Sequence, residues 1–213
     1  MIINRVSDIR QAFRRSYINQ DFRGNGTIEL RGVSFLADQD SIFGTPNQEY
    51  IRAEIAWYES GDRRVQKLFD LYGKEVKIWK DVADEHGEVN SNYGWCINSL
   101  HRFFQYQEVY HALRSDKFTR QGVMIYTTPA MHKVAGKDFT CTNAVQYLTN
   151  GPYLDVVVQM RSNDAVFGYA NDLAWQQHVQ KKLCREVGLQ RGDITWQVGS
   201  MHVYERHYHL IEA

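Results

Sequence analysis

Cys141 is the best candidate for a nucleophile in the sequence. Only the thiolate form of a cysteine is strongly nucleophilic, and a nearby guanidinium group favours that form. A β-rich run starts at Cys141 and ends before Asn150-Gly151, a strong hairpin-turn signal, and the run after the turn reaches Arg161. We therefore expect Cys141 and Arg161 at the open end of a hairpin, where a bend is needed to aim the arginine at the thiol. The alternative is a buried, unreactive cysteine.

Glu54 is a candidate acid or base. Together with Tyr50, Trp57 and Tyr58 it falls at helical spacings of three and four residues, so one helix face carries this carboxylate among aromatic rings. Burial among those rings would raise the pKa of Glu54. A solvated carboxylate beside an apolar stripe is the alternative, and periodicity alone leaves both interpretations open.

Arginines and small hydroxyl side chains gather at predicted loops and strand ends. Arg23 lies in the loop RGNGT, Arg120 precedes the strand GVMIYTT, and Arg161 is followed by Ser162. Bidentate guanidinium contacts combined with a hydroxyl donor suit a phosphate dianion. These four residues are therefore candidate phosphate ligands, and scattered surface arginines are the alternative.

Histidines are concentrated in the C-terminal segment WQVGSMHVYERHYHL, which contains His202, His207 and His209. Their spacing does not match a helical histidine pair with a carboxylate, so we expect no metal site. His202 and Tyr204 instead share one strand face by its period of two, where they can hydrogen-bond a sugar hydroxyl. The sequence also has no glycine-rich nucleotide fingerprint of the Rossmann or P-loop kind.

Helices and strands that position these side chains are predicted from hydrophobic periodicity and turn residues. They are a helix in residues 1–16, a loop over 21–26, a strand over 27–36 with a bend at Arg31-Gly32, a helix over 47–60 that Gly61 ends, the hairpin runs 141–149 and 152–162, and a helix from Asn171 or Asp172 to Gly188. No repeat and no Pro/Gly/Ser-rich linker divides the chain. We therefore expect residues 1–213 to form a single domain.

Length and composition exclude several classes of protein. The 213 residues carry 25 basic and 25 acidic side chains, so no net charge attracts a nucleic acid or an anionic membrane. No apolar run approaches the ~20 residues of a membrane span, and the N-terminus lacks the hydrophobic core of a signal peptide. Cys96 and Cys184 bring the cysteines to an odd count without a close pair, which argues against a disulfide framework. These features predict a cytoplasmic protein.

In their order along the chain, these motifs resemble those of the thymidylate synthase superfamily, and most closely those of its phage-type deoxycytidylate (dCMP) hydroxymethylases. The landmarks are EIAWYESGD, KIWKDVADEHGEVNSNYG, CTNAVQY, MRSNDAVFGYANDLAW and GSMHVY, which together extend over roughly nine-tenths of the chain. The resemblance implies an α+β fold with a thymidylate synthase-like mixed sheet, helices on one face of it, and a homodimer packed sheet to sheet.

The resemblance also assigns roles to the candidate residues. Cys141 matches the nucleophile that adds to C6 of a pyrimidine and so makes C5 reactive toward the one-carbon unit of 5,10-methylenetetrahydrofolate. Glu54 matches the general acid/base. The phosphate ligands match Arg23, Arg120, Arg161 and Ser162, with Arg120 reaching across the dimer into the other subunit's site. Gln121 stands where the family often has a second arginine, which weakens one phosphate contact or signals a different one.

Asp172 is expected to choose the base. Thymidylate synthases carry an asparagine at this position, whereas a carboxyl group can donate to N3 of cytosine and accept from its 4-amino group, so a cytidine monophosphate is favoured. Other residues match positions that bind the sugar, the base or the folate. They are His202, Tyr204 and Gln146 for sugar and base, and Asp164, Trp79 and Tyr93 for folate.

The function implied by the resemblance is conversion of dCMP to 5-hydroxymethyl-dCMP with 5,10-methylenetetrahydrofolate and water, in a bacterial or phage-infected cytoplasm. The chain ends at Ala213 without the tail that thymidylate synthases close over the folate, so we expect water to be admitted. The alternatives are a CMP 5-hydroxymethylase of a nucleoside antibiotic pathway, a reductive C5 methylase, and a non-catalytic nucleotide-binding relative. The joint presence of Cys141, Glu54 and Asp164 speaks against the last.

Overall fold

The chain forms two compact units in a computed structural model, which describes residues 4–99, 103–132 and 138–212. The first unit combines residues 1–46 with residues 147–213, and the second unit holds residues 47–146. Strand β4 (Thr142–Asn150) passes from the second unit into the first without a linker, so we retain a single domain over residues 1–213 as a proposal. Within the described residues, no helix combines the length and the apolar character needed to cross a membrane.

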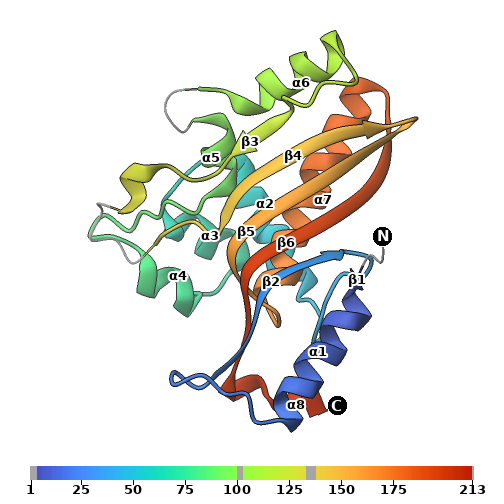
Figure 1. Cartoon of the computed structure of the whole chain (residues 1–213). Coiled ribbons are helices and arrows are strands. Elements are labelled where there is room, and N and C mark those ends of the chain that lie inside the picture. Colours follow the sequence, from blue (N-terminus) through green and yellow to red (C-terminus); the bar gives the residue numbers. More distant parts are fainter. Residues whose placement is uncertain (1–3, 100–102, 133–137, 213) are drawn as a thin grey trace. The chain divides into compact units, whose positions relative to one another are not determined.

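The first unit contains a mixed sheet (Figure 1). Its strands follow the order β1 (Asn4–Arg5), β2 (Thr27–Leu36), β6 (Gln190–Tyr204), β5 (Tyr153–Asp164) and the second half of β4. Pairing is antiparallel between β2 and β6, and parallel between β5 and β6 and between β1 and β2. The predicted hairpin joins β4 to β5, and Gly151 takes a left-handed conformation with φ of 60° in its turn. The predicted α+β class with a mixed sheet is confirmed.

Helices α1 (Val6–Ile18) and α7 (Gly168–Val187) pack on this sheet, α1 against β2 and α7 against β5 and β6. The 3-10 turn η3 (Glu205–His207) and helix α8 (His209–Glu212) follow β6. Helix α7 ends at Gly188 as predicted, but it begins at Gly168 rather than at Asn171 or Asp172. The carboxylate of Asp164 accepts the backbone N–H groups two and three residues later, and this turn starts the helix early.

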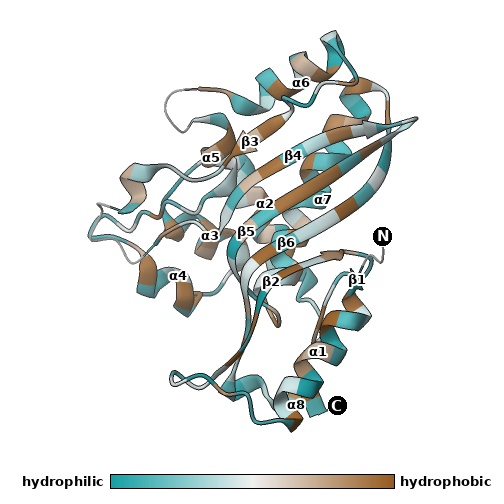
Figure 2. Ribbon diagram, viewed as in Figure 1, coloured by the Kyte–Doolittle hydropathy of each residue, from teal (hydrophilic) through white to brown (hydrophobic). Residues whose placement is uncertain are grey.

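Every second residue of β5 and β6 is buried, and this alternation shifts by one residue near the carboxyl end of each strand. Gly199 stands at this change, and a Cβ there would lie 3.0 Å from the carbonyl oxygen of Arg161, so the absent side chain eases the close approach of the two strands. Figure 2 shows the hydrophobic middle of β5 in brown. Beyond the change, Ser162, Ser200 and His202 are only half-buried, which leaves a polar end on an apolar sheet.

The second unit is mainly helical. It contains α2 (Gln48–Ser60), α3 (Val65–Tyr72), α4 (Lys77–Val82), α5 (Tyr93–Asn98), α6 (Gln105–Ser115), β3 (Val123–Ile125) and the 3-10 turn η2 (Pro129–His132). Strand β3 pairs antiparallel with the first half of β4. Helix α2 agrees with its prediction, because the Asn47 side chain caps its first turn and Gly61 ends it with φ of 63°.

Helix α5 lies directly against the backbone of α2. A Cβ at Gly94 would stand 1.7 Å from the carbonyl oxygen of Tyr58, a separation that no side chain tolerates. Tyr93, the first residue of α5, stacks its ring on that of Tyr58 with centroids 5.1 Å apart. The close approach therefore fixes the aromatic face of α2 on which Glu54 lies.

Candidate active site

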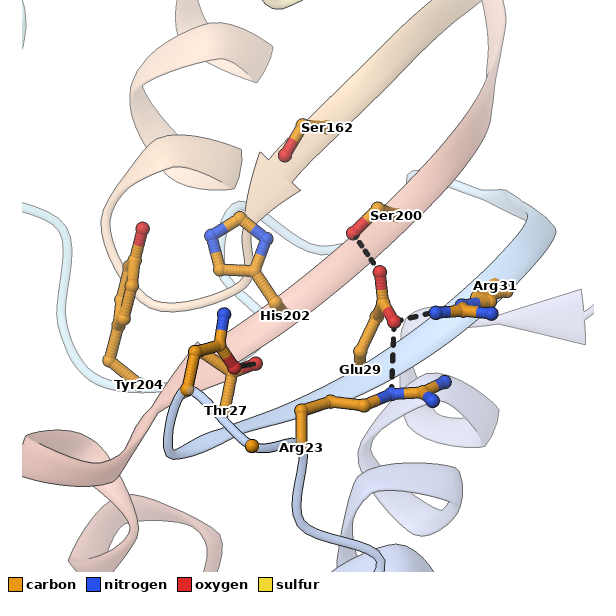
Figure 3. A pocket seen from close by; sticks show the side chains of 10 residues that line it. Arg23, Thr27, Glu29, Arg31, Ser162, Ser200, His202 and Tyr204 are labelled. Atoms are coloured by element: carbon orange, nitrogen blue, oxygen red, sulfur yellow. Dashed lines mark hydrogen bonds and ion pairs between the residues drawn. The ribbon is translucent and has the colours of Figure 1, made fainter.

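One pocket of the first unit collects four of the residues predicted to bind a nucleotide. Arg23, Ser162, His202 and Tyr204 all line a cavity of about 440 Å³ at the ends of β2, β5 and β6 (Figure 3). The rings of His202 and Tyr204 meet edge to face, with centroids 4.9 Å apart, so the two residues share a face as their spacing predicted. The structure thus brings these side chains together, and their roles toward a nucleotide remain predictions.

Strand register explains why these side chains meet. Residues directly opposite one another on paired strands point to the same side of a sheet. The pairings of β2, β6 and β5 produce two polar rows, Arg31–Ser200–Ser162 and Glu29–His202–Asp164.

Glu29 lies at the centre of the pocket and had not been singled out from the sequence. Its Oε1 accepts the hydroxyl of Ser200 at 2.6 Å, and its Oε2 lies 2.8 Å from Nε of Arg31 and 3.1 Å from Nε of Arg23 (Figure 3). The hydrogen bond from Ser200 and then that from Arg31 lower the pKa of Glu29. An ionised carboxylate therefore holds two guanidinium groups side by side.

Asp172 is fixed by a chain of hydrogen bonds inside the first unit. The Trp196 indole N–H donates to Oδ1 of Asn163 at 3.1 Å, and Nδ2 of Asn163 donates to Oδ2 of Asp172 at 2.7 Å. Because an indole can only donate, the Asn163 amide has one possible orientation and Oδ2 of Asp172 must accept. The other carboxyl oxygen of Asp172 is then the one that can carry a proton.

Asp164 and Arg161 occupy less expected positions. Both carboxylate oxygens of Asp164 accept backbone N–H groups at the start of α7, at 3.0 and 3.4 Å. A carboxylate has further lone pairs, so this turn leaves acceptor capacity for a ligand. Arg161 is exposed on β5 and is not among the residues that line the pocket, although Ser162 beside it is.

Glu54 lies in a polar and aromatic cluster of the second unit. Its side chain is buried, with 4% of the residue exposed, and Oε1 accepts the hydroxyl of Tyr50 at 2.5 Å. Burial raises the pKa of Glu54 to about 7, and hydrogen bonds from Tyr50, Trp79 and Tyr58 oppose that rise. The prediction of a carboxylate buried among aromatic rings is confirmed, and the alternative of a solvated one is wrong.

Trp79 and Tyr93, predicted to contact folate, belong to the same cluster. The indole N–H of Trp79 donates to the hydroxyl oxygen of Tyr50 at 2.7 Å, and its ring meets Trp57 edge to face at 5.1 Å. Tyr93 is buried, stacked on Tyr58. Half-buried Trp79 keeps part of its aromatic surface accessible, whereas Tyr93 presents little.

Cys141 directly precedes β4 and is half-buried, and none of the three cysteines forms a disulfide. Cys96 is buried, which strongly raises the pKa of its thiol, and burial also raises the pKa of the Cys184 thiol. Neither is therefore suited to act as a thiolate. Next to Cys141, the fully buried hydroxyl of Thr142 has no hydrogen-bond partner among the described residues.

Arg120 lies in an exposed loop of the second unit. Its carbonyl oxygen accepts Nε2 of Gln146 at 2.9 Å, so the amide that was predicted to contact the base here holds the Arg120 loop to β4. Gln121 is also exposed, and its backbone N–H donates to the side chain of Thr119 at 3.2 Å. Within the described part of the chain, no cluster of three or more His, Cys, Asp or Glu side chains is arranged to hold a metal ion.

Comparison with known proteins identifies relatives over almost the whole chain. A family model described as thymidylate synthase matches residues 42–213. The deoxycytidylate 5-hydroxymethyltransferase of Enterobacteria phage T4 is 44% identical over 222 residues, which cover 97% of this chain and 89% of that protein. The proteins of the same name from phages T2 and T6 give the same values.

More distant relatives share the fold. A thymidylate synthase from Corynebacterium aurimucosum is 24% identical over 215 residues, covering 96% of this chain and 78% of that protein. Among solved structures, the thermostable thymidylate synthase A from Bacillus subtilis superposes with a TM-score of 0.72 at 18% identity, covering 95% of this chain and 82% of that one.

Proposed function

Because the chain belongs to the thymidylate synthase family, we propose that it is a deoxycytidylate 5-hydroxymethyltransferase, which converts dCMP to 5-hydroxymethyl-dCMP. The observation that carries this proposal is the 44% identity, over nearly the full length, to phage enzymes named for that activity. The geometry of Asp172 supports the choice of base. With Oδ2 held as an acceptor by Asn163, a proton on Oδ1 can be donated to N3 of cytosine while the carboxyl group accepts from the 4-amino group.

In the proposed reaction the thiolate of Cys141 forms a bond to C6 of the ring, which makes C5 electron-rich. 5,10-Methylenetetrahydrofolate, when bound, supplies the one-carbon unit. Glu54 moves protons, for which a pKa of about 7 is well suited near neutral pH. C5 bonds to that carbon and loses its proton, tetrahydrofolate departs, and water adds to the carbon now carried on C5. The thiolate then leaves C6 and the ring regains its double bond. The product therefore has the composition of dCMP plus CH2O.

The first-unit pocket supports binding of the nucleotide's phosphate and sugar. We assign the phosphate to Arg23 and Ser162, with Arg161 beside the pocket, and the sugar hydroxyl to His202 and Tyr204. For folate, the accessible ring surface of Trp79 and the spare acceptor capacity of Asp164 fit a flat heterocycle that carries N–H donors.

We further propose a homodimer, packed sheet to sheet, in which Arg120 serves the partner's site. Support comes from the exposed positions Gln159 and Arg161 on β5 and Gly199 on β6, which leave part of the sheet uncovered within its own unit, and from the exposed Arg120 loop. The measured mass in solution should then be twice the 24.9 kDa of one chain.

The test of the proposed activity is the mass of the product. The enzyme is incubated separately with dCMP, CMP and dUMP, each with 5,10-methylenetetrahydrofolate, and the masses of the nucleotides are measured by mass spectrometry. We expect dCMP to gain CH2O most rapidly, with tetrahydrofolate released. A gain of CH2 with formation of dihydrofolate would instead identify a methylase, and preference for CMP a ribonucleotide enzyme.

A further inference from the structure

Tyr50 connects two residues of the second-unit cluster in a directed chain of hydrogen bonds. Its hydroxyl lies 2.7 Å from Nε1 of Trp79 and 2.5 Å from Oε1 of Glu54. Tyr50 and Glu54 are one helical turn apart on α2, so the contact between them is built into the helix.

The direction of this chain follows from the chemistry of its members. An indole N–H can only donate, so the Tyr50 oxygen accepts from Trp79 and the single hydroxyl proton of Tyr50 is directed to Oε1 of Glu54. Oε1 is therefore an acceptor in both protonation states of Glu54. Tyr58 and Trp79 also hydrogen-bond the Glu54 carboxyl group, so Tyr50 is one of three donors that orient it.

The position of Tyr50 is itself fixed from two sides. Its ring meets that of Tyr72 edge to face at 5.3 Å, and the Tyr72 hydroxyl accepts Nδ2 of Asn47 at 3.0 Å. The same Asn47 caps α2, because its Oδ1 accepts the backbone N–H of Tyr50 at 3.0 Å. The helix cap therefore also holds the tyrosine that contacts Glu54.

We propose that Tyr50 is a positioning residue, which holds Oε1 of Glu54 as an acceptor and so orients the carboxyl group for proton exchange during the reaction. The proposal rests on the proposed function. The titratable groups that face Glu54 are Tyr50 and Tyr58 of α2, with Tyr72 of α3 and Tyr93 of α5 behind them. Among the described residues no charged side chain contributes to its protonation equilibrium.

Tyr50→Phe removes the hydroxyl and keeps the ring. Since that hydrogen bond favours the ionised carboxylate, its loss raises the pKa of Glu54 further. One limb of the pH profile of kcat should depend on Glu54 and disappear in Glu54→Gln, and in Tyr50→Phe we expect this limb to move to higher pH by about one unit. We also expect kcat to fall about tenfold or more, while KM for dCMP stays unchanged within about twofold.

Tyr72→Phe is the matched control, because it removes a hydroxyl that contacts Asn47 rather than Glu54. An unmoved limb in Tyr50→Phe, or an equal movement in Tyr72→Phe, contradicts the proposal. A ¹³C NMR titration of the Glu54 carboxyl in the wild type and in Tyr50→Phe reads the same shift without turnover. That titration separates failure of the positioning role from failure of the proposed function.

A second inference rests on the first-unit pocket and is independent of Tyr50. Glu29 binds Arg23 and Arg31 through their Nε atoms only. Among the described residues nothing else pairs with these two guanidinium groups, so their Nη groups remain available. Ser162 lies two strands away, in the same row as Arg31.

We infer that Arg31 is a phosphate ligand of the nucleotide, and that it supplies a guanidinium group in place of the arginine missing at Gln121. Glu29 keeps the two like-charged groups of Arg23 and Arg31 at bonding distance from one oxygen, which orients four N–H-bearing nitrogens without a ligand. This inference also rests on the proposed function.

The test compares Arg31→Met with Arg15→Met, an exposed arginine of α1 that lies outside the pocket. We expect Arg31→Met to weaken dCMP binding, measured by calorimetry, about tenfold or more, and to leave binding of deoxycytidine unchanged, because only the phosphate contact is lost. Equal affinities of Arg31→Met and Arg15→Met for dCMP, or a parallel loss for deoxycytidine, would overturn the inference. Binding is read without turnover, so an inactive enzyme does not obscure the result.

Discussion

Nδ2 of Asn163 donates to Oδ2 of Asp172 at 2.7 Å, and the indole of Trp196 prevents the Asn163 amide from turning round. The residue that we expect to select the base is therefore oriented before any ligand binds. Gly168 leaves room for this pair, since a Cβ there would lie 3.1 Å from Nδ2 of Asn163.

Asp172→Asn is expected to shift the substrate preference from dCMP to dUMP. The new amide can still accept from Asn163 through its oxygen, and its NH2 group then donates to O4 of uracil instead of to N3 of cytosine. The ratio of kcat/KM for dCMP to that for dUMP should fall by about two orders of magnitude or more. A ratio unchanged from the wild-type value would refute this account of base selection.

Glu54→Gln is expected to change both activity and stability with pH. The folded-state pKa is raised to about 7, from an ordinary value of 4.5, so the folded protein holds a proton that the unfolded chain releases between these values. Wild-type stability contributed by Glu54 is then present at pH 4 and lost as pH rises through 7. Urea denaturation should find Glu54→Gln gaining relative to wild type by on the order of 3 kcal/mol between pH 5 and pH 8.

The same variant should lose about 10²- to 10⁴-fold in kcat, because glutamine cannot exchange a proton. A difference in stability that does not change with pH would show that Glu54 is ionised in the folded protein, contrary to our interpretation.

Gly94→Ala is expected to destabilise the second unit severely. Its Cβ would overlap the carbonyl group of Tyr58, with the oxygen at 1.7 Å and the carbon at 2.4 Å, and only displacement of α5 from α2 relieves this overlap. We expect the free energy of unfolding to fall by about 3 kcal/mol or more. Gly24→Ala, where nothing lies within 4 Å of the added carbon, is the control and should remain within about 0.5 kcal/mol of wild type. Equal stabilities of the two variants would contradict the packing of α5.

The contribution of Arg120 across a dimer can be tested by mixing two inactive variants. A mixed dimer of Cys141→Ala and Arg120→Ala contains one site in which both residues are wild type, if Arg120 serves the partner. Activity should therefore reappear after the two variants are unfolded and refolded together. Continued inactivity of a mixture whose mixed dimers are detected by native mass spectrometry would place Arg120 in its own subunit's site or outside any site.

Local sequence patterns predicted the parts of the structure that depend on local spacing. Helix α2 follows from its cap at Asn47 and its terminator Gly61. Helical periodicity also places Tyr50, Trp57 and Tyr58 on the face of Glu54, but it left the burial of Glu54 open. The facing pair His202 and Tyr204 follows from the period of a strand.

The pocket around Glu29 depends on contacts between residues far apart in the sequence, which local spacing cannot predict. Glu29 and Ser200 are 171 residues apart, and only the pairing of β2 with β6 brings them together. The alternation of Glu29 and Arg31 on one strand was nevertheless a usable signal, of the same kind as that for His202 and Tyr204. The role of Asn163 could not be predicted, because it depends on Trp196 from another strand.

The most direct test of the reaction is to trap the bond between Cys141 and the nucleotide. The enzyme is incubated with 5-fluoro-dCMP and 5,10-methylenetetrahydrofolate, digested, and analysed by mass spectrometry. The fluorine at C5 cannot be removed as the C5 proton normally is, so the ring should stay bonded to the enzyme. We predict an adduct of nucleotide and folate on the peptide that contains Cys141, and none in Cys141→Ala. A wild-type enzyme that turns over dCMP without such an adduct on that peptide would contradict covalent catalysis by Cys141.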